Sequence, residues 1–441
     1  LMDKLYHEFR DPIHTFIRVD SKERNVINSR PYQRMRHIHQ LAMTHYIYPG
    51  ATHTRFEHAL GVMELAGRVY DIVTNSDNQH KRIREQDFVP RTDHDRAYWR
   101  RTVRMAALCH DLGHSAFSHG PEHLFPKDEA GKPWTHERMS YALIMSAGMK
   151  PLWDDMKLAP ADVAKLAIGK KETIKFDENI TFNTWEAIVS EIVVGDAFGV
   201  DRMDYLLRDS LHAGVAYGRF DHYRLIDTLR ILPQSEESEE PKLGVEHGGL
   251  HSAEQMLLAR YFMFTQVYLH PVRRAYDKHL VAFLEKTLPN GKFPTGLEEY
   301  QNLTDNEILT DIASQARNPS APAHSEALRI FDRKHFKKMW QRNAADRERN
   351  INALNCIYNA AKEKFGAVNI IRDSYPAKNS VISFPVLVGN TIADSINASD
   401  VLKTIPPAVA EFVLVRPDLL AEARKWYEDN RLGIIHETNC T

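Results

Sequence analysis

The sequence predicts a mainly α-helical protein in which a helical core, residues 1–285, is followed by a smaller α+β region. Apolar residues recur at helical spacing through most of the first region, and the clearest stripe runs from Phe56 to Val73. From about residue 286, Pro, Asn and Gly become frequent. Strand-like runs follow at 381–388 and 411–415, so residues 286–441 are predicted to form a separate α+β region.

Composition narrows the functional classes. The chain has 441 residues and an apolar fraction of 43%, which is enough for a sizeable core. A formal net charge of −2 does not suggest a nucleic-acid coat protein or a membrane-surface binder. No apolar run approaches the roughly 20 residues needed to span a bilayer, and three widely spaced cysteines, an odd number, argue against a disulfide framework. We therefore expect a cytoplasmic protein without a membrane partner, and nucleic acid is a disfavoured partner.

The first elements precede a long buried helix. Alternating residues and a proline within 3–28 predict a turn with a short strand or hairpin. A helix is predicted from Pro31, where proline suits the first turn, and it breaks at 46–50. A longer helix begins near Thr54 and is apolar on most of its circumference. This helix is therefore buried, and His58 lies inside or at the edge of the interior.

Polar and helical segments alternate through the middle of the chain. Residues 75–98 are polar without periodicity, and we interpret them as an exposed insertion. The next helix is predicted at about 99–111, and Thr135 is predicted to cap a further helix. A strongly apolar helix at 187–194 leads into the segment 199–209.

Three more helices and one turn are predicted beyond this point. The helices are a short one at 223–232, an aromatic-rich one at 253–268, and a basic, polar one through 333–350. The acidic stretch 233–241 is predicted to be a surface turn.

The most informative stretch is 109–119, where His110 and Asp111 end a core helix. Unpaired buried polar groups cost several kcal/mol, so a bound metal best explains this pair. Imidazole and carboxylate together suit a divalent transition ion: Fe, Mn, Zn, Ni or Co. His58 and the later Asp201 complete a candidate four-ligand site. Catalysis needs positions left open for water, which favours an octahedral ion over a closed tetrahedral one.

These residues also resemble a known family. The order His58, His110-Asp111, Asp201 is the H…HD…D pattern of the HD-domain metal phosphohydrolases. Longer matches resemble the HD-domain deoxynucleoside triphosphate triphosphohydrolases, in particular the mammalian SAM-and-HD-domain type and its bacterial-type relatives without a SAM domain. The matching segments are Gln40-Leu41, Tyr48 to His58, His110 to His119, Thr135 to Glu137, Asp201 to Asp209 and Arg273 to Tyr276. The resemblance covers roughly residues 3–285 and implies an HD-domain helical core.

The resemblance implies three groups of site residues. The implied metal ligands are His58, His110, Asp111 and Asp201. The implied catalytic residues are His119, Glu122, His136 and Glu137. The implied substrate contacts are Gln40, Leu41, Arg55, His114, Arg202, Tyr205, Asp209, Tyr276 and Asp277. In this scheme His119 is the general acid for the 5′-oxygen of the leaving group, and the Glu122 carboxylate raises its basicity.

The resemblance implies a dNTP triphosphohydrolase, in which hydroxide formed at the metal attacks the α-phosphorus and releases a deoxynucleoside and inorganic triphosphate. A magnesium ion is expected to bridge the phosphates. One alternative is an HD phosphohydrolase acting on another nucleotide, either a monophosphate or a signalling nucleotide. A second alternative is a sensor that binds nucleotides or single strands.

The resemblance also implies partners beyond the dNTP substrate. We expect a homo-oligomer, as a dimer, tetramer or hexamer, with residues 286–441 serving oligomerisation or regulation. A nucleotide activator is a further candidate partner. Asn28-Ser29 stands where the mammalian enzyme reads an activating guanine with an Asp, and Asp277 replaces a Gln near the base. Both the activator and the base preference are therefore left open.

Overall fold

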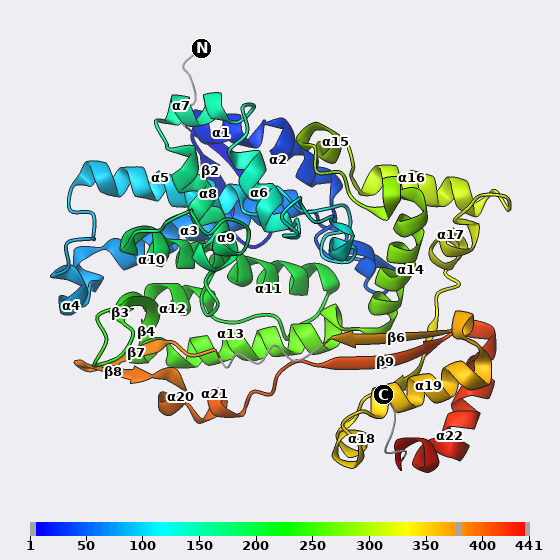
Figure 1. Ribbon diagram of the computed structural model, residues 1–441. Coiled ribbons are helices and arrows are strands. Elements are labelled where there is room, and N and C mark those ends of the chain that lie inside the picture. Colours follow the sequence, from blue (N-terminus) through cyan, green and yellow to red (C-terminus); the bar gives the residue numbers. More distant parts are fainter. Residues whose placement is uncertain (1–5, 376–381, 437–441) are drawn as a thin grey trace.

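The computed structural model describes residues 6–375 and 382–436 and is mainly helical (Figure 1). Helices dominate the first two thirds of the chain, and strands from both early and later segments form small sheets. The prediction of a mainly α protein with a smaller α+β C-terminal region is confirmed. Residue 381, the first of a predicted strand-like run, lies outside the described residues. Within the described residues, no helix combines the length and the apolar character that crossing a membrane requires.

Two strands and two short helices precede the core. Their bounds are β1 His7–Asp11, β2 Thr15–Val19, α1 Ser21–Ile27 and α2 Arg30–Arg34. The predicted hairpin is confirmed, because β1 and β2 pair antiparallel. The helix predicted from Pro31 is shorter than expected: Ile38 is extended, and its carbonyl accepts a hydrogen bond from the Arg55 backbone N at 3.0 Å. This tertiary pairing overrides the helical spacing of the apolar residues.

The helical core is assembled around α3. The core helices are α3 Arg55–Thr74, α4 Lys81–Arg84, α5 Asp93–Cys109, α6 His136–Ile144, α7 Lys150–Met156, α8 Pro160–Ile168, α9 Lys170–Phe176, α10 Thr184–Val194, α11 Val200–Ala213 and α12 His222–Asp227. At the start of α3, the Glu57 carboxylate accepts the Thr54 backbone N–H at 2.9 Å. The helix is buried over most of its length and packs against α5, α10 and α11. The prediction of a buried helix from Thr54 is confirmed.

The segment 75–98 contains more structure than an exposed insertion. Ile83 and Val89 are buried in the main core, and α5 starts at Asp93 because the Thr92 side chain accepts a hydrogen bond from the first turn. Polar composition concealed these anchors, because each is a single apolar residue without a periodic neighbour.

A four-stranded sheet joins distant parts of the chain. Its strands, in spatial order, are β3 Leu229–Pro233, β4 Pro241–Glu246, β7 Pro385–Val388 and β8 Thr391–Asp394. β4 and β7 are parallel, and the other pairs are antiparallel. The helix predicted at 223–232 is wrong after Asp227: β3 is buried along its whole length, and a short, mostly apolar run cannot distinguish strand from helix. The predicted turn at 233–241 connects β3 to β4.

A second group of helices follows this hairpin. The bounds are α13 Leu250–Met263, α14 Pro271–Thr287, α15 Leu297–Gln301, α16 Asp305–Ala316 and α17 His324–Phe331. The predicted helix at 253–268 is confirmed, and its last turn, Phe264–Tyr268, is π-helical. α14 continues past residue 285 and contacts α17 and the later β5, Lys337–Gln341.

The C-terminal segments form a small α+β unit with its own apolar cluster. The other elements of this unit are α18 Ala344–Arg349, α19 Ala353–Phe365, β6 Ile370–Tyr375, β9 Ala410–Val415 and α22 Leu420–His436. Between β6 and β9, the short helices α20 Ser395–Ala398 and α21 Asp400–Thr404 pack instead against the four-stranded sheet and α13. β9 lies between β5 and β6 (Figure 1). The basic helix predicted at 333–350 is wrong over β5, because Met339 and Trp340 are buried there and pull this stretch into the sheet. The helical part of the predicted range is α18.

Candidate metal and phosphate site

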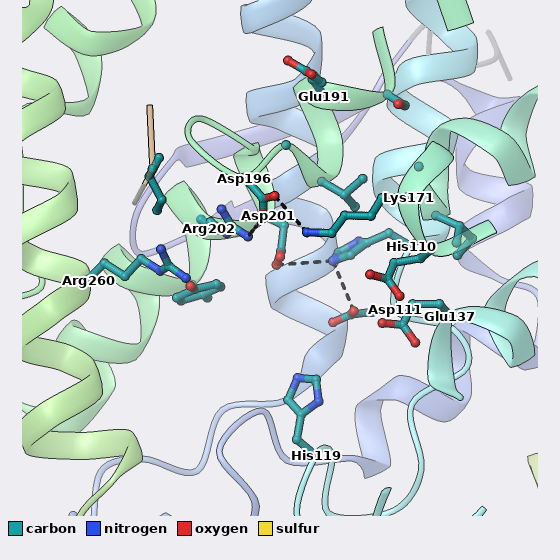
Figure 2. Close-up of a pocket in the computed structure, with 18 of the residues that line it drawn as sticks. His110, Asp111, His119, Glu137, Lys171, Glu191, Asp196, Asp201, Arg202 and Arg260 are labelled. Carbon is teal, nitrogen blue, oxygen red and sulfur yellow. Dashed lines mark hydrogen bonds and ion pairs between the residues drawn. The ribbon is translucent and has the colours of Figure 1, made fainter. Parts of the chain in front are cut away.

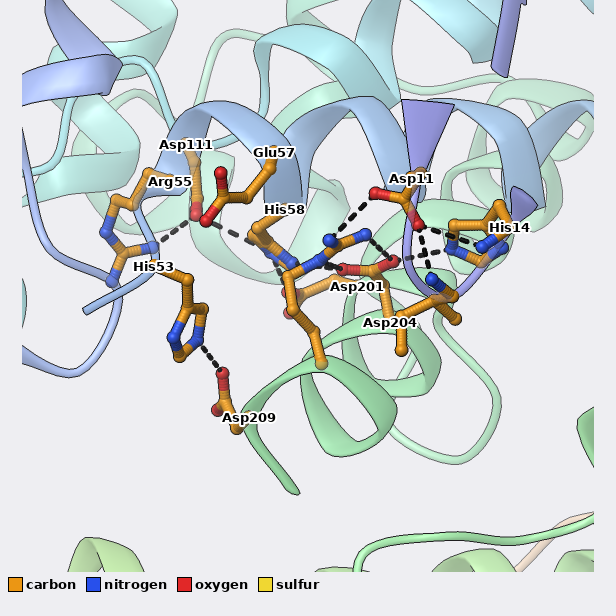
Figure 3. Close-up of polar contacts among 12 residues, drawn as sticks. Asp11, His14, His53, Arg55, Glu57, His58, Asp111, Asp201, Asp204 and Asp209 are labelled. Atoms are coloured by element: carbon orange, nitrogen blue, oxygen red, sulfur yellow. Dashed lines mark hydrogen bonds and ion pairs between the residues drawn. The ribbon is translucent and has the colours of Figure 1, made fainter. Parts of the chain in front are cut away.

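Three helix termini bring the predicted metal ligands together. α3 places His58 in its first turn, α5 ends at Cys109 directly before His110, and α11 begins one residue before Asp201. The nearest ligand atoms of these three residues lie within 4.8 Å of one another. His58 Nε2 is 3.2 Å from Asp201 Oδ1, and His110 Nε2 is 3.5 Å from the same oxygen. Figure 3 shows His58 and Asp201 facing each other.

The fourth predicted ligand, Asp111, lies beside this group. Its Oδ1 is 3.3 Å from His110 Nε2, and its Oδ2 is 3.7 Å from His58 Nε2. The same carboxylate is paired with the Arg55 guanidinium. All four predicted ligands therefore occupy one place, with a cation at its edge.

Both imidazoles are oriented by acceptors on their other nitrogen. His58 Nδ1 donates to Asp204 Oδ2 at 2.9 Å, and His110 Nδ1 donates to the Ala107 carbonyl at 2.7 Å. A proton held on Nδ1 leaves Nε2 of neutral imidazole with a free lone pair. Within the described residues, His110 Nε2 is buried without a hydrogen-bond partner. Two lone pairs and two carboxylates facing one point fit a divalent metal.

Asp204 anchors a buried polar network that sequence reasoning missed. Its fully buried carboxylate also accepts from His14 Nε2 at 2.7 Å and from Arg208 at 2.8 and 3.0 Å. Arg208 in turn donates to Asp11 at 2.9 Å (Figure 3). The spacing of Asp204 and Arg208, four residues apart on α11, was the available signal for that pair. Asp11 and His14 arrive from the β1–β2 turn, for which no local signal exists.

The electrostatics of the cluster favour bound positive charge. Burial lowers the pKa of His58, but hydrogen bonds to Asp201 and Asp204 outweigh it and raise the pKa to about 10. Burial raises the pKa of Asp201, but the adjacent His110 and His58 imidazoles hold the pKa below its ordinary value. These carboxylates stay ionised and stabilise a cation, whether proton or metal, at the imidazole nitrogens.

A second histidine–carboxylate cluster adjoins the first. Glu122 bridges two imidazoles, because one oxygen is 3.2 Å from His119 Nδ1 and the other pairs with His136 Nδ1. His136 Nε2 is 3.3 Å from Glu137, and the His136 ring stacks on His114 with centroids 4.0 Å apart. The predicted catalytic residues therefore form one connected group next to the predicted metal ligands.

The charge states in this second cluster differ between neighbours. Burial lowers the pKa of His136, but Glu122 and Glu137 outweigh it and raise the pKa to about 9. Burial, together with Arg55 and His136, holds the pKa of His114 well below its ordinary value. A protonated His136 thus stacks on a neutral His114, and Glu122 remains ionised because the two imidazoles hold its pKa down against the effect of burial.

Both clusters open onto a cavity of about 1620 Å³. The predicted residues that line it are Gln40, Leu41, Arg55, His110, Asp111, His114, His119, Glu122, His136, Glu137, Asp201, Arg202, Tyr205, Asp209 and Asp277. The cavity lining does not include His58 and Tyr276. His58 is fully buried beneath the site. Tyr276 stacks on Tyr46, with ring centroids 4.8 Å apart, and lies near His335.

Basic side chains dominate one wall of the cavity. Arg202 donates to Asp196 at 2.9 Å, and Lys171 Nζ is 3.1 Å from the other oxygen of the same carboxylate (Figure 2). Further lining cations that sequence reasoning missed are Arg260, Arg273 and Arg274. On another wall, Asp209 accepts hydrogen bonds from His53 at 2.7 Å and Tyr268 at 2.8 Å. Cations, a metal-binding cluster and hydroxyl acceptors together suit a phosphorylated, polar ligand.

Comparison with known proteins agrees with this geometry. The model of the HD domain matches residues 55–167, the stretch that carries His58, His110 and Asp111. Residues 55–167 of the chain therefore form an HD domain. A second model, of the HD associated region, matches residues 220–365 of this HD-domain protein.

Several relatives of the HD-domain protein are similar over much of its length. The human deoxynucleoside triphosphate triphosphohydrolase SAMHD1 is 31% identical over 75% of this chain and 54% of its own. The uncharacterized protein YwfO of Bacillus subtilis is 31% identical over 63% of this chain and 55% of its own. The chain spans about half the length of these curated relatives. A hypothetical protein from Aquifex aeolicus has a crystal structure that matches 95% of this chain and 99% of its own, with a TM-score of 0.74 and 28% identity.

Proposed function

We propose that this HD-domain protein is a metal-dependent dNTP triphosphohydrolase, which converts a dNTP and water into a deoxynucleoside and inorganic triphosphate. One observation carries the proposal: the His/Asp cluster opens onto a cavity whose wall also carries Arg55, Arg202 and the His119–Glu122 pair. The human relative named a deoxynucleoside triphosphate triphosphohydrolase supports the choice of substrate class.

The metal would be held by His58, His110, Asp111 and Asp201. Two imidazole nitrogens and two carboxylates suit Fe, Mn, Zn, Ni or Co. When bound, the ion supplies a Lewis acid that makes a water molecule more acidic and stabilises negative charge on a phosphoryl oxygen. The triphosphate is expected to enter as its magnesium complex, in which Mg²⁺ bridges the phosphates.

The chain's own residues supply charge and protons around the α-phosphate. Arg55 and Arg202 stabilise the charge that develops on the phosphoryl oxygens. His119 donates a proton to the departing 5′-oxygen, a step typically worth roughly 10²–10⁴-fold in rate. Glu122 accepts the Nδ1 proton of His119, so the transferable proton sits on Nε2. His136 and Glu137 complete the polar wall that faces the phosphates.

The sugar end would be formed by Gln40, Leu41, Tyr205 and Asp209. Asp209 and Gln40 are placed to hydrogen-bond a 3′-hydroxyl, and Gln40 Oε1 is buried without a hydrogen-bond partner within the described residues. Leu41 packs against the deoxyribose face where a 2′-hydroxyl would clash. Asp277 would lie near the base. Its two carboxylate oxygens are also buried without hydrogen-bond partners within the described residues.

The test is product analysis by anion-exchange chromatography. Manganese-loaded protein is incubated with each dNTP, singly and in mixtures, and with the matching ribonucleotides. Equal amounts of deoxynucleoside and triphosphate are expected, with much slower turnover of ribonucleotides. Inorganic phosphate or pyrophosphate without triphosphate would refute the proposal and favour an HD phosphohydrolase acting on another nucleotide.

Two additions complete the experiment. The variant His110→Ala/Asp111→Ala should lose both bound metal and activity, and retained activity would exclude this site. Stimulation only in nucleotide mixtures would reveal an activator. Light scattering of the same samples would determine whether the protein is a dimer, tetramer or hexamer.

A further inference from the structure

The turn that carries His119 has a strained backbone. Phe117 and Ser118 have φ angles of 58° and 59°, so two successive residues with side chains occupy the left-handed region. Each such residue costs roughly 1–2 kcal/mol relative to its preferred conformations. A turn of this kind persists only where neighbouring groups hold it. The groups that hold it therefore determine where His119 points.

The principal support comes from α16, far along the chain. Asp305 is fully buried, and its Oδ1 accepts the Phe117 backbone N–H at 2.7 Å. Its Oδ2 accepts both the backbone N–H and Nδ1–H of His39, at 2.8 and 2.7 Å. One carboxylate therefore receives three donors from two segments that are far from it in sequence. Hydrogen bonds to an ionised acceptor are about twice as strong as neutral ones.

A second bridge runs from the same histidine to the phosphate-binding side of the site. The Ser118 hydroxyl donates to the His39 carbonyl at 2.7 Å and accepts from Arg55 Nε at 2.9 Å. Arg55 is also paired with Asp111. A chain of contacts therefore links Asp305 to the turn, from the turn to the predicted phosphate contact Arg55, and from Arg55 to the predicted metal ligand Asp111.

We propose that Asp305 is a positioning residue that holds the left-handed turn at Phe117-Ser118, and thereby aims His119 at the scissile bond. The inference rests on the proposed function, in which His119 is the general acid. Asp305 lies outside the HD-domain match and inside the HD-associated match, so this region supplies a buried support for the catalytic turn. Asp305 itself does not line the cavity.

The rest of the site keeps other supports when Asp305 is removed. The segment carrying His39 also pairs with the start of α3, where Gln40 N donates to the His53 carbonyl at 3.0 Å and Arg55 N to the Ile38 carbonyl at 3.0 Å. Asp305→Ala therefore removes the acceptor of the Phe117 amide and of both His39 donors, but the His39 segment stays tied to the start of α3. The metal ligands are expected to remain in place.

Asp305 also begins α16, so a control must separate helix stability from turn geometry. Glu307 provides it, because its carboxylate caps the same helix by accepting the Thr304 backbone N–H at 2.8 Å and hydroxyl at 2.5 Å. Glu307→Gln weakens this cap without touching the turn. Asp305→Asn is the conservative variant, since its amide oxygen can still accept the Phe117 N–H.

The first readout needs no substrate. Hydrogen exchange, measured by mass spectrometry, should accelerate at least about tenfold in peptides covering residues 115–120 of Asp305→Ala, because the protecting carboxylate is gone. Glu307→Gln should leave those peptides unchanged while its thermal midpoint falls. Unchanged exchange at 115–120 in Asp305→Ala would overturn the proposal.

The second readout compares leaving groups. A nucleoside 5′-oxygen needs a proton as it departs, whereas p-nitrophenolate does not. Asp305→Ala should therefore lower kcat for dNTP about 100-fold, the cost of a misplaced catalytic group. It should lower turnover of bis(p-nitrophenyl) phosphate by less than about threefold, as should His119→Ala. Asp305→Asn should lie between wild type and Asp305→Ala for dNTP.

The double variant gives the decisive comparison. If Asp305 acts through His119, then His119→Ala/Asp305→Ala should be no slower with dNTP than His119→Ala alone. Equal losses on both substrates, or additive losses in the double variant, would show that Asp305 has only a structural role. Failure of the proposed function is separable from either result, because it would appear as wild-type protein that releases no triphosphate.

Discussion

Replacing Asp204 with asparagine should weaken metal binding without dismantling the helical core. The buried Asp204 carboxylate accepts the His58 Nδ1 proton at 2.9 Å, as well as donors from His14 and Arg208. Asparagine has a similar shape, but its amide offers only one oxygen to these donors. His58 then loses the charged acceptor that fixes its tautomer and ring orientation.

The size of the effect follows from linkage. Loss of an outer carboxylate of this kind typically weakens metal binding by roughly 10- to 100-fold. With metal in large excess, the metal-dependent part of the free energy of unfolding should fall by ~1.4 to ~2.7 kcal/mol. A separate cost appears without metal, because Arg208 loses one charged partner. Its remaining bond to Asp11, at 2.9 Å, should keep that cost below the ~3–5 kcal/mol of a fully broken buried pair.

The assay is urea unfolding of metal-free and manganese-loaded protein, combined with manganese affinity from competition with a fluorescent chelator. Asp196→Asn is the matched control: it removes the same charge from the rim, where Asp196 binds Arg202 and Lys171, and should change manganese affinity less than about twofold. The reasoning is refuted if Asp204→Asn destabilises the metal-free protein but binds manganese as tightly as wild type.

Four further outcomes are expected. A Cβ at Gly61 would come within 1.9 Å of Asp204 Oδ1, so Gly61→Ala should displace the carboxylate and lower the thermal midpoint of the metal-free protein. The pKa of His136 is raised to about 9. The stabilisation from its positive charge is therefore fully present below about pH 6.5 and is lost as the pH rises through about 9. In urea unfolding, the stability gap between wild type and His136→Gln should therefore shrink as the pH rises toward about 10. Arg202→Met should raise the KM for dNTP about tenfold with little change in thermal midpoint. Chelation should abolish activity, and added manganese should restore it.

The sequence predicts the long helices correctly because apolar residues at helical spacing mark them without reference to any distant segment. The buried helix from Thr54 and the helix at 253–268 each carry apolar residues over several turns. The errors at 229–232 and 333–350 arose where long-range pairing decided the outcome. β3 is a short run buried between neighbours, and β5 is basic in composition but is drawn into a sheet by Met339 and Trp340.

The residues of the site also fall into two groups: those that the sequence reveals and those that only the fold reveals. His110 and Asp111 stand next to each other and are visible in the sequence. His58 and Asp201 are candidate partners from the sequence alone, and the H…HD…D family pattern supports both. Asp204 could have been suspected from its spacing on α11. Asp305 could not, because it lies 188 residues from the Phe117 amide that it holds, and only the packed fold shows the contact. Sequence patterns reveal side chains that do chemistry more readily than those that aim them.

The parallel pairing of β4 with β7 also constrains how this chain is made. Val245 pairs with Val386, so β4, from just past the middle of the chain, cannot pair with β7 until about 140 further residues have been translated. At about 5–20 residues per second, that delay lasts roughly 7 to 30 seconds, during which the β4 edge is exposed on the nascent chain. A fragment ending at residue 285 would leave this edge exposed permanently and would also lack Asp305. Expression of the HD-domain part alone should therefore give a protein prone to aggregation.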